Sequence, residues 1–126
     1  MSKKRSDGVK SDREFLKHIL DEIHFVKQET KGLVFGDFIK NEMLKRACTR
    51  SLEIIGEAAK NLSPGFRKRY IDIEWKKLAG LRDKIIHFYF GVNWDIVWDV
   101  IEKKLPGLED QIERMLEEID EGRETK

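Results

Sequence analysis

Apolar residues recur every three or four positions along most of the chain, which is the spacing of amphipathic α-helices. One such run spans residues 11–30, where Ser11 or Asp12 is expected to cap the first turn. A longer run spans residues 37–61, with Asp37 as its expected cap. Because glycine in mid-helix costs about 1 kcal/mol relative to alanine, Gly56 in this second run indicates a close helix contact or a bend.

Helical patterns continue through the second half of the chain, with clear punctuation between them. Ser63 and Pro64 suit the cap and first turn of a short helix. Residues 81–91 are predicted to be helical, with Gly91 as the closing left-handed residue. Two further helices are expected on either side of Pro106, which must kink or break the helix. The predicted class is all-α, an antiparallel four-helix bundle with short extra helices.

The length of 126 residues is enough for one domain with a single core. We expect that domain to span residues 11–121. It would be preceded by a flexible tail over residues 1–10, which is polar and basic, and followed by a frayed tail over residues 122–126.

The charges of the chain nearly cancel, with 25 Lys and Arg against 24 Asp and Glu. Tight nucleic-acid binding would therefore need local clustering of basic residues. The one cysteine, Cys48, permits no internal disulfide and lies on an apolar stripe, so it is predicted to be a core residue in a reducing compartment. No signal peptide or membrane-length apolar run is present, and a cytoplasmic protein is expected.

Reactive side chains are densest in the segment LRDKIIHFYFG, residues 81–91. It places Arg82, Asp83, His87 and Tyr89 close together in the sequence. Histidine can act as acid or base near neutral pH, and arginine binds phosphate oxygens through two donors. If the segment is helical, Asp83 lies one turn before His87 and can fix the tautomer of its imidazole. Arg82 and His87 are the candidate catalytic residues, with Asp83 in a supporting role.

Other polar and aromatic groups have simpler explanations. Tryptophans that fit the apolar stripes are predicted to be core residues: Trp75, Trp94 and Trp98. The basic run is predicted to be a solvated face and a weak RNA-binding candidate: Arg67, Lys68 and Arg69. No metal site or cofactor is predicted, because the spacings of the possible ligands do not fit one: Glu53 and Glu57, His18 and His24.

The string from Arg82 to Tyr89 fits the motif R-x-x-x-x-H-x-Y, and its surroundings carry two further signatures. These are Leu52-Glu53-Ile54-Ile55-Gly56-Glu57-Ala58-Ala59 upstream and Gly91-Val92-Asn93-Trp94-Asp95-Ile96-Val97-Trp98 with Leu105-Pro106 downstream. With Trp75, this ordered set resembles the HEPN superfamily and, within it, the HepT-like toxins. The resemblance covers about residues 12–118. The second motif position, often Asn in this group, is Asp83 here.

The resemblance implies a homodimeric, metal-independent ribonuclease that is the toxin of a toxin–antitoxin pair, with RNA, including tRNA, as candidate substrate. It implies Arg82 and His87 as catalytic residues. The implied partner is a minimal nucleotidyltransferase antitoxin of the MntA-like type, which silences the toxin by transferring AMP to Tyr89. A two-fold dimer would bring two copies of each catalytic residue to one cleft, which matches the need for both an acid and a base.

Two other functions remain open from the sequence. One is a non-catalytic HEPN-type dimeric partner of a nucleotidyltransferase, or a nucleotide-binding module. The other is a plain helical interaction protein, since a lone Arg and His on a helix are more often structural when judged by composition alone. The intact pair of Arg82 and His87 favours the ribonuclease, because a scaffold needs neither.

Overall fold

The computed structural model describes residues 3–87 and 91–122, with side chains over residues 11–85 and 91–122. In chain order the elements are α1 (Lys3–Thr30), α2 (Phe35–Lys40), α3 (Glu42–Lys60), α4 (Pro64–Arg69), α5 (Trp75–Ala79), α6 (Leu81–Ile85), β1 (Ile86–His87), β2 (Gly91–Val92), α7 (Trp94–Asp99), the π-helical turn η1 (Val100–Lys104) and α8 (Leu105–Asp120). The all-α prediction is confirmed, and the short pair of strands is the exception within the described residues.

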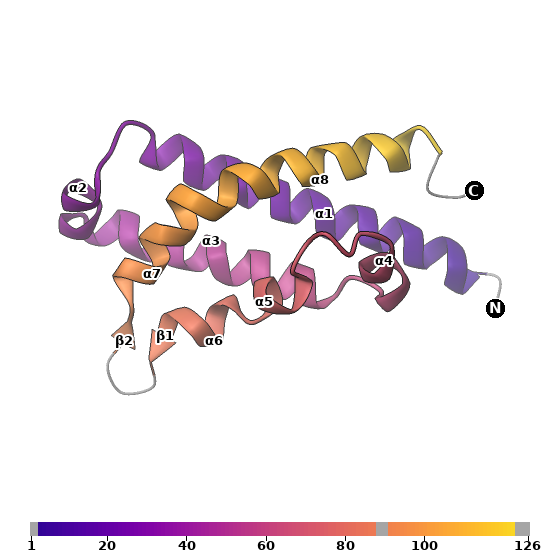
Figure 1. The fold of residues 1–126 in the computed structure, drawn as a ribbon, viewed down its shortest axis with the longest axis horizontal. Coiled ribbons are helices and arrows are strands. Elements are labelled where there is room, and N and C mark those ends of the chain that lie inside the picture. The colour runs from indigo at the N-terminus through magenta and orange to yellow at the C-terminus, as the bar shows by residue number, and fades with distance from the viewer. Residues whose placement is uncertain (1–2, 88–90, 123–126) are drawn as a thin grey trace.

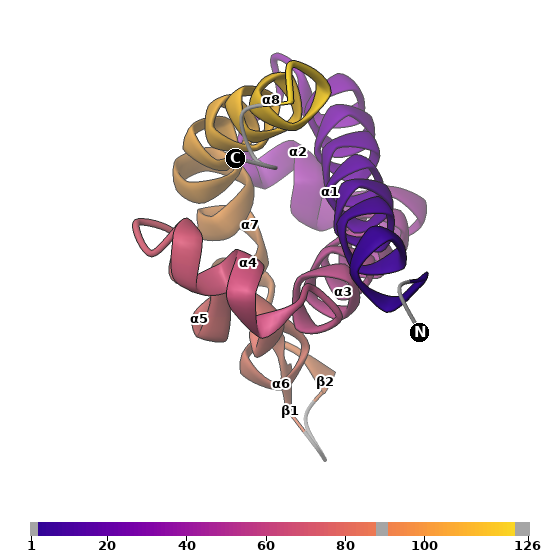
Figure 2. The ribbon, with the colours of Figure 1, turned by 90° about the vertical axis from the view of Figure 1, so that its right-hand side faces the viewer.

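The long helices enclose one apolar core. Helix α1 packs against both α3 and α8, and α5 and α6 pack against α3. Figure 1 shows α5, α6 and the hairpin along the side of α3 that lies away from α1, and Figure 2 shows α6 and the hairpin on that side from the end. The predicted helical stripes supply the core, which includes Leu16, Ile19, Ile23, Val26, Leu52, Ile55, Leu105 and Ile112. Trp75 and Trp98 are buried, and Trp94 is partly buried and packs against the core, as predicted.

Helix α1 begins at Lys3 and not near Ser11, so residues 3–10 are helical where a flexible tail was expected. Asp12 does not cap this helix. Its carboxylate oxygens accept hydrogen bonds from the backbone N–H and the hydroxyl of Ser63, at 2.8 and 2.7 Å. Asp12 is only 6% exposed, so these bonds satisfy a carboxylate that would otherwise be costly to bury. Asp12 therefore joins α1 to the start of α4.

The single helix expected over residues 37–61 is divided at Asn41, and that prediction is wrong. Asn41 has an extended backbone, and its side chain accepts a hydrogen bond from the N–H of Leu44 at 3.0 Å, capping α3. Asp37 lies in the first turn of α2, where it accepts from the N–H of Val34 at 3.1 Å. The helix is divided at Asn41 because the short side chains of Asp37 and Asn41 accept hydrogen bonds from nearby backbone N–H groups in place of helical carbonyls.

The local predictions at Gly56 and Ser63 are confirmed. A Cβ added to Gly56 would lie 3.2 Å from the carbonyl oxygen of Leu78 and 3.5 Å from that of Ala79, so α3 and α5 approach closely at this point. The hydroxyl of Ser63 accepts from the N–H of Phe66 at 3.3 Å and caps α4. The sequence thus predicts both features through residues whose chemistry is strictly local.

Pro106 does not break the last helix. The N–H of Leu105 donates to the carbonyl of Val100, five residues back, so the backbone widens into η1 just before the proline. Pro106 then occupies the first turn of α8, where a missing N–H costs little. The expected kink takes the form of a π-helical turn.

Candidate active site

The segment that carries the R-x-x-x-x-H motif divides between a helix and a hairpin. Helix α6 ends at Ile85, and β1 pairs antiparallel with β2, with Ile86 opposite Val92 and His87 opposite Gly91. The N–H of Asn93 donates to the carbonyl oxygen of Ile85 at 2.7 Å and closes the base of the hairpin. The predicted helix over residues 81–91 is therefore wrong beyond Ile85.

Two local causes favour this change of structure. Ile85 and Ile86 are β-branched, and such side chains are well accommodated in extended backbone. Gly91 has a φ of 78°, a left-handed conformation that glycine adopts readily. Gly91 does supply the left-handed residue that the sequence predicts, but it serves the hairpin and does not end a helix.

Arg82 and Asp83 lie within the described residues, whereas the second half of the motif does so only in part. The backbone of His87 lies in β1, whereas its side chain and the whole of Tyr89 are outside the described residues. Asp83 is exposed on α6. The expectation that Asp83 and His87 share one helical face is wrong, because the helix ends between them.

Arg82 is held at the surface by a residue of another helix. Its Nε donates to the Oε2 of Glu53, on α3, at 3.1 Å. The Arg82 side chain is 58% exposed and that of Glu53 is 20% exposed. Because the contact uses Nε, the two Nη groups can still present a fork of donors to a phosphate. From the sequence, Glu53 was considered only as a metal ligand. Its contact with Arg82 could not be predicted, because no sequence pattern shows how α3 and α6 are placed in register.

The basic run from Arg67 to Arg69 is not brought to this place. It lies on α4, at the opposite end of the molecule from the hairpin (Figure 1). Arg67 is half-buried, and its Nε has no hydrogen-bond partner in the part of the chain that the structure describes. The run and Arg82 therefore belong to separate surfaces.

Possible metal ligands come together where the sequence offered no hint of it. His24 of α1 and two residues of α8, Glu109 and Glu113, place ligand atoms within 4.8 Å of one another. Glu109 also bonds the Nζ of Lys27 at 2.6 Å, and this hydrogen bond raises the pKa of Lys27. With His24 Nε2 at 3.0 Å from Glu109, the group forms a polar bridge between α1 and α8. The spacing of residues along one helix could not predict this cluster, because His24 comes from α1 and the two glutamates come from α8.

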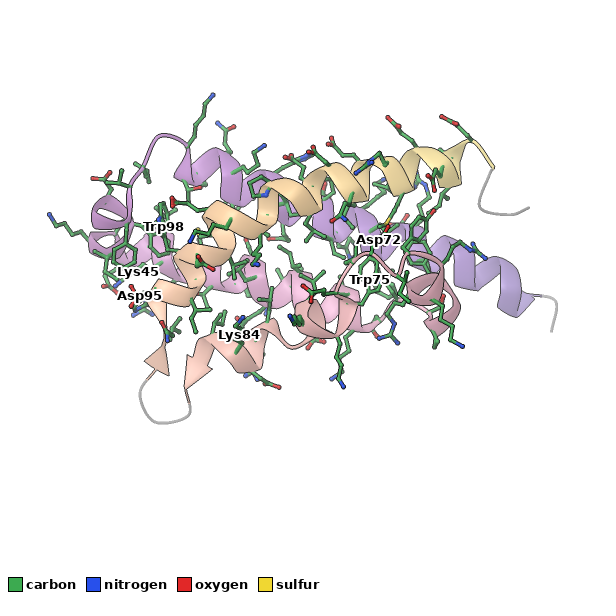
Figure 3. All side chains as sticks on the ribbon, in the orientation of Figure 1. Lys45, Asp72, Trp75, Lys84, Asp95 and Trp98 are labelled. Carbon is green, nitrogen blue, oxygen red and sulfur yellow. The ribbon has the colours of Figure 1, made fainter. Side chains whose placement is uncertain are left out.

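A cleft lies on another side of α6 from Glu53. It encloses about 650 Å³ between α5 and α6 on one wall and α7, η1 and α8 on the other. Its floor is apolar and its rim carries charges of both signs, including Lys84 and Asp95, which Figure 3 labels. Arg82 is not among its lining residues. Arg82 and Lys84, two residues apart on α6, therefore lie on different surfaces.

Cys48 is fully buried, which confirms its prediction as a core residue. Burial, with a smaller effect of the charge of Glu29, raises the pKa of its thiol to about 11. Among the described residues, none of the helices has the length and apolar character needed to span a membrane.

Comparison with known proteins identifies the family. A family described as "Ribonuclease HepT-like" matches residues 19–115. A protein of Caldanaerobacter subterraneus subsp. tengcongensis, whose name marks it as an inferred RNase, is 50% identical over 109 residues, covering 86% of this chain and 97% of that protein. A similarly named protein of Methanocaldococcus jannaschii is 40% identical over 111 residues, covering 88% and 92%.

A third relative, from Thermococcus cleftensis, bears the name probable ribonuclease HepT and is 34% identical over 106 residues, covering 84% of this chain and 96% of its own. No solved structure matches the chain. The names of these relatives support an RNase activity for proteins of this type. The family match spans most of the folded part, including the motif from Arg82 to His87, and the chain belongs to the HepT-like ribonuclease family.

Proposed function

We propose that the protein is a metal-independent endoribonuclease, the toxin of a toxin–antitoxin pair, which cuts RNA at a site shared by two copies of the chain. The observation that carries the proposal is the state of Arg82, whose guanidinium is exposed and yet held through Nε by Glu53 at 3.1 Å. An arginine fixed in this way keeps its Nη donors for an anion. It stands five residues before His87, at the start of the segment that turns back as a hairpin.

RNA cleavage without a metal needs a base for the 2′-hydroxyl and an acid for the 5′-oxygen. The 2′-oxygen attacks phosphorus while the bond to the 5′-oxygen breaks. His87 of one copy takes the 2′ proton, and its counterpart from the second copy protonates the departing oxygen. Arg82 neutralises the charge that gathers on the phosphorane oxygens. One chain supplies one His87, so a two-fold dimer provides the required pair.

Tyr89 follows His87 by two residues and is proposed as the acceptor of AMP from a minimal nucleotidyltransferase antitoxin. Its phenolic oxygen would attack the α-phosphate of ATP, releasing pyrophosphate and a proton. The attached AMP would add bulk and negative charge where an RNA phosphate must enter, and so would silence the toxin. Mass spectrometry after incubation with the antitoxin and ATP should find added AMP on the wild type and none on Tyr89→Phe.

The direct test is digestion of total RNA and of tRNA in the presence of EDTA. Wild type should cut RNA, while His87→Ala and Arg82→Ala should not, each with an unchanged far-UV circular dichroism spectrum. Asp83→Asn, which introduces the residue often found at this motif position in HepT-like toxins, should remain active. If wild type, His87→Ala and Arg82→Ala behave alike, the ribonuclease function is rejected and the non-catalytic dimeric partner takes its place.

A further inference from the structure

Two arginines share the exposed face of α3 that carries Glu53. Arg46, Arg50 and Glu53 are spaced by four and three residues, which places them on one side of the helix. Both arginines are exposed. Within residues 11–85 and 91–122 neither forms a hydrogen bond or an ion pair. Glu42, one turn before Arg46, is bonded at 2.7 Å to Lys45 instead.

Contacts at either end of residues 45–53 of α3 fix this stretch of the helix beside the motif, although Lys45 itself is buried and lies off the exposed face. At one end, Glu53 binds Arg82, the second residue of α6. At the other, the Nζ of Lys45 lies 4.8 Å from the ring centroid of Trp94, which begins α7 just after the hairpin. Figure 3 shows Lys45 and Asp95 together at that end of the molecule. Along the axis of α3, Arg46 and Arg50 therefore lie between the position of Arg82, before the hairpin, and that of Trp94, after it.

The middle of this face carries two positive charges, those of Arg46 and Arg50, while Glu42 and Glu57 lie exposed toward its ends. Glu53 offsets the charge of Arg82, whereas no described residue pairs with Arg46 or Arg50. A row of exposed guanidiniums beside a phosphodiester site suits the repeated charge of a nucleic-acid backbone, because most contacts to nucleic acids are made to phosphates.

We propose that Arg46 and Arg50 bind the phosphates next to the scissile one, so that single-stranded RNA lies along the exposed face of α3. This inference rests on the proposed function and assigns its substrate path. It also separates that path from the basic run on α4, which lies at the other end of the molecule (Figure 1). Arg46 and Arg50 contribute to binding and positioning of RNA, and the chemistry stays with Arg82 and His87.

The test measures binding apart from cleavage. A short fluorescein-labelled single-stranded RNA is titrated by fluorescence anisotropy with protein carrying His87→Ala, so that the probe stays intact. In that background Arg46→Gln and Arg50→Gln should each weaken binding about fivefold at roughly 0.1 M salt. Each should also reduce the slope of log Kd against log salt by about 0.7. Arg114→Gln is the matched control, an exposed arginine on α8 with no hydrogen bond or ion pair in the described part of the chain.

Cleavage by the same variants without His87→Ala should show a raised KM and a nearly unchanged kcat. The inference is overturned if Arg46→Gln and Arg50→Gln bind RNA as tightly as Arg114→Gln does. It is also overturned if the RNA does not bind at all. If RNA binds through Arg46 and Arg50 but wild type cuts nothing, the binding face stands and the ribonuclease function fails.

Discussion

The Nε of Arg82 donates a hydrogen bond to the Oε2 of Glu53 across 3.1 Å, which joins α6 to α3 at the candidate active site. Removal of this acceptor should free Arg82 without unfolding the protein, because a pair this exposed contributes below about 1 kcal/mol to stability. We expect Glu53→Ala to lower kcat for RNA cleavage by about tenfold, since small displacements of a positioning group are costly to rate.

Glu53→Gln should keep most of the activity, because its amide oxygen can still accept from Nε. Glu57→Ala, one turn further along α3 and exposed, is the matched control and should cleave RNA like wild type. Equal rates for Glu53→Ala and Glu57→Ala would show that the contact does not position Arg82.

Asp12 is predicted to be a major stabilising residue of the N-terminal half. It is buried and accepts two hydrogen bonds from Ser63, so Asp12→Ala leaves both donors without their partner. Urea unfolding should show that Asp12→Ala lowers the free energy of unfolding by about 1–3 kcal/mol. Ser11→Ala alters the neighbouring exposed residue, which caps nothing in the middle of α1, and should change stability by less than about 0.5 kcal/mol.

Gly56 should not tolerate a side chain, although alanine is the better helix former. A Cβ at this position meets the backbone oxygen of Leu78 at 3.2 Å, and backbone cannot rotate away as a side chain can. We expect Gly56→Ala to destabilise the protein by about 1–2 kcal/mol in thermal or urea unfolding.

Gly36 provides the comparison, because a Cβ there meets nothing within 4 Å and its φ is not in the left-handed region. Gly36→Ala should be neutral or stabilising by up to about 1 kcal/mol. A stabilised Gly56→Ala would contradict the close packing of α3 against α5.

The thiol of Cys48 should make stability depend on alkaline pH. Burial raises its pKa in the folded state to about 11, from 9.0 for an exposed thiol. Folding therefore favours the protonated thiol. The stability that this adds is fully present below the pKa of the thiol in the unfolded chain, and it is lost as the pH rises toward 11. Between about pH 8 and pH 11, the stability of Cys48→Ala relative to wild type should rise by about 2 kcal/mol, measured by urea unfolding. A constant difference would show that the thiol titrates normally.

The sequence predicts those features whose cause is local. Ser63 beside Pro64 specifies a helix start, and Gly56 within an apolar stripe specifies a close contact, because each depends on a few adjacent residues. The partners of Asp12 and Arg82 could not be predicted, since they lie 51 and 29 residues away and depend on how the helices are placed in register. The end of α6 was missed although its causes are local, because the apolar spacing of this segment also fits a helix, whereas Asn93 bonds the carbonyl of Ile85 and closes a hairpin.

The π-helical turn η1 has a consequence for how the chain can vary in length. A bond from residue i to i−5 accommodates one residue more than the ordinary α-helical bond, so loss of a residue at η1 can be absorbed by a return to regular winding. In α3 the same loss would rotate everything downstream by about 100° and carry Glu53 and Gly56 away from α5 and α6. Insertions and deletions among proteins of this family are therefore expected at η1, while the interior of α3 keeps a fixed length.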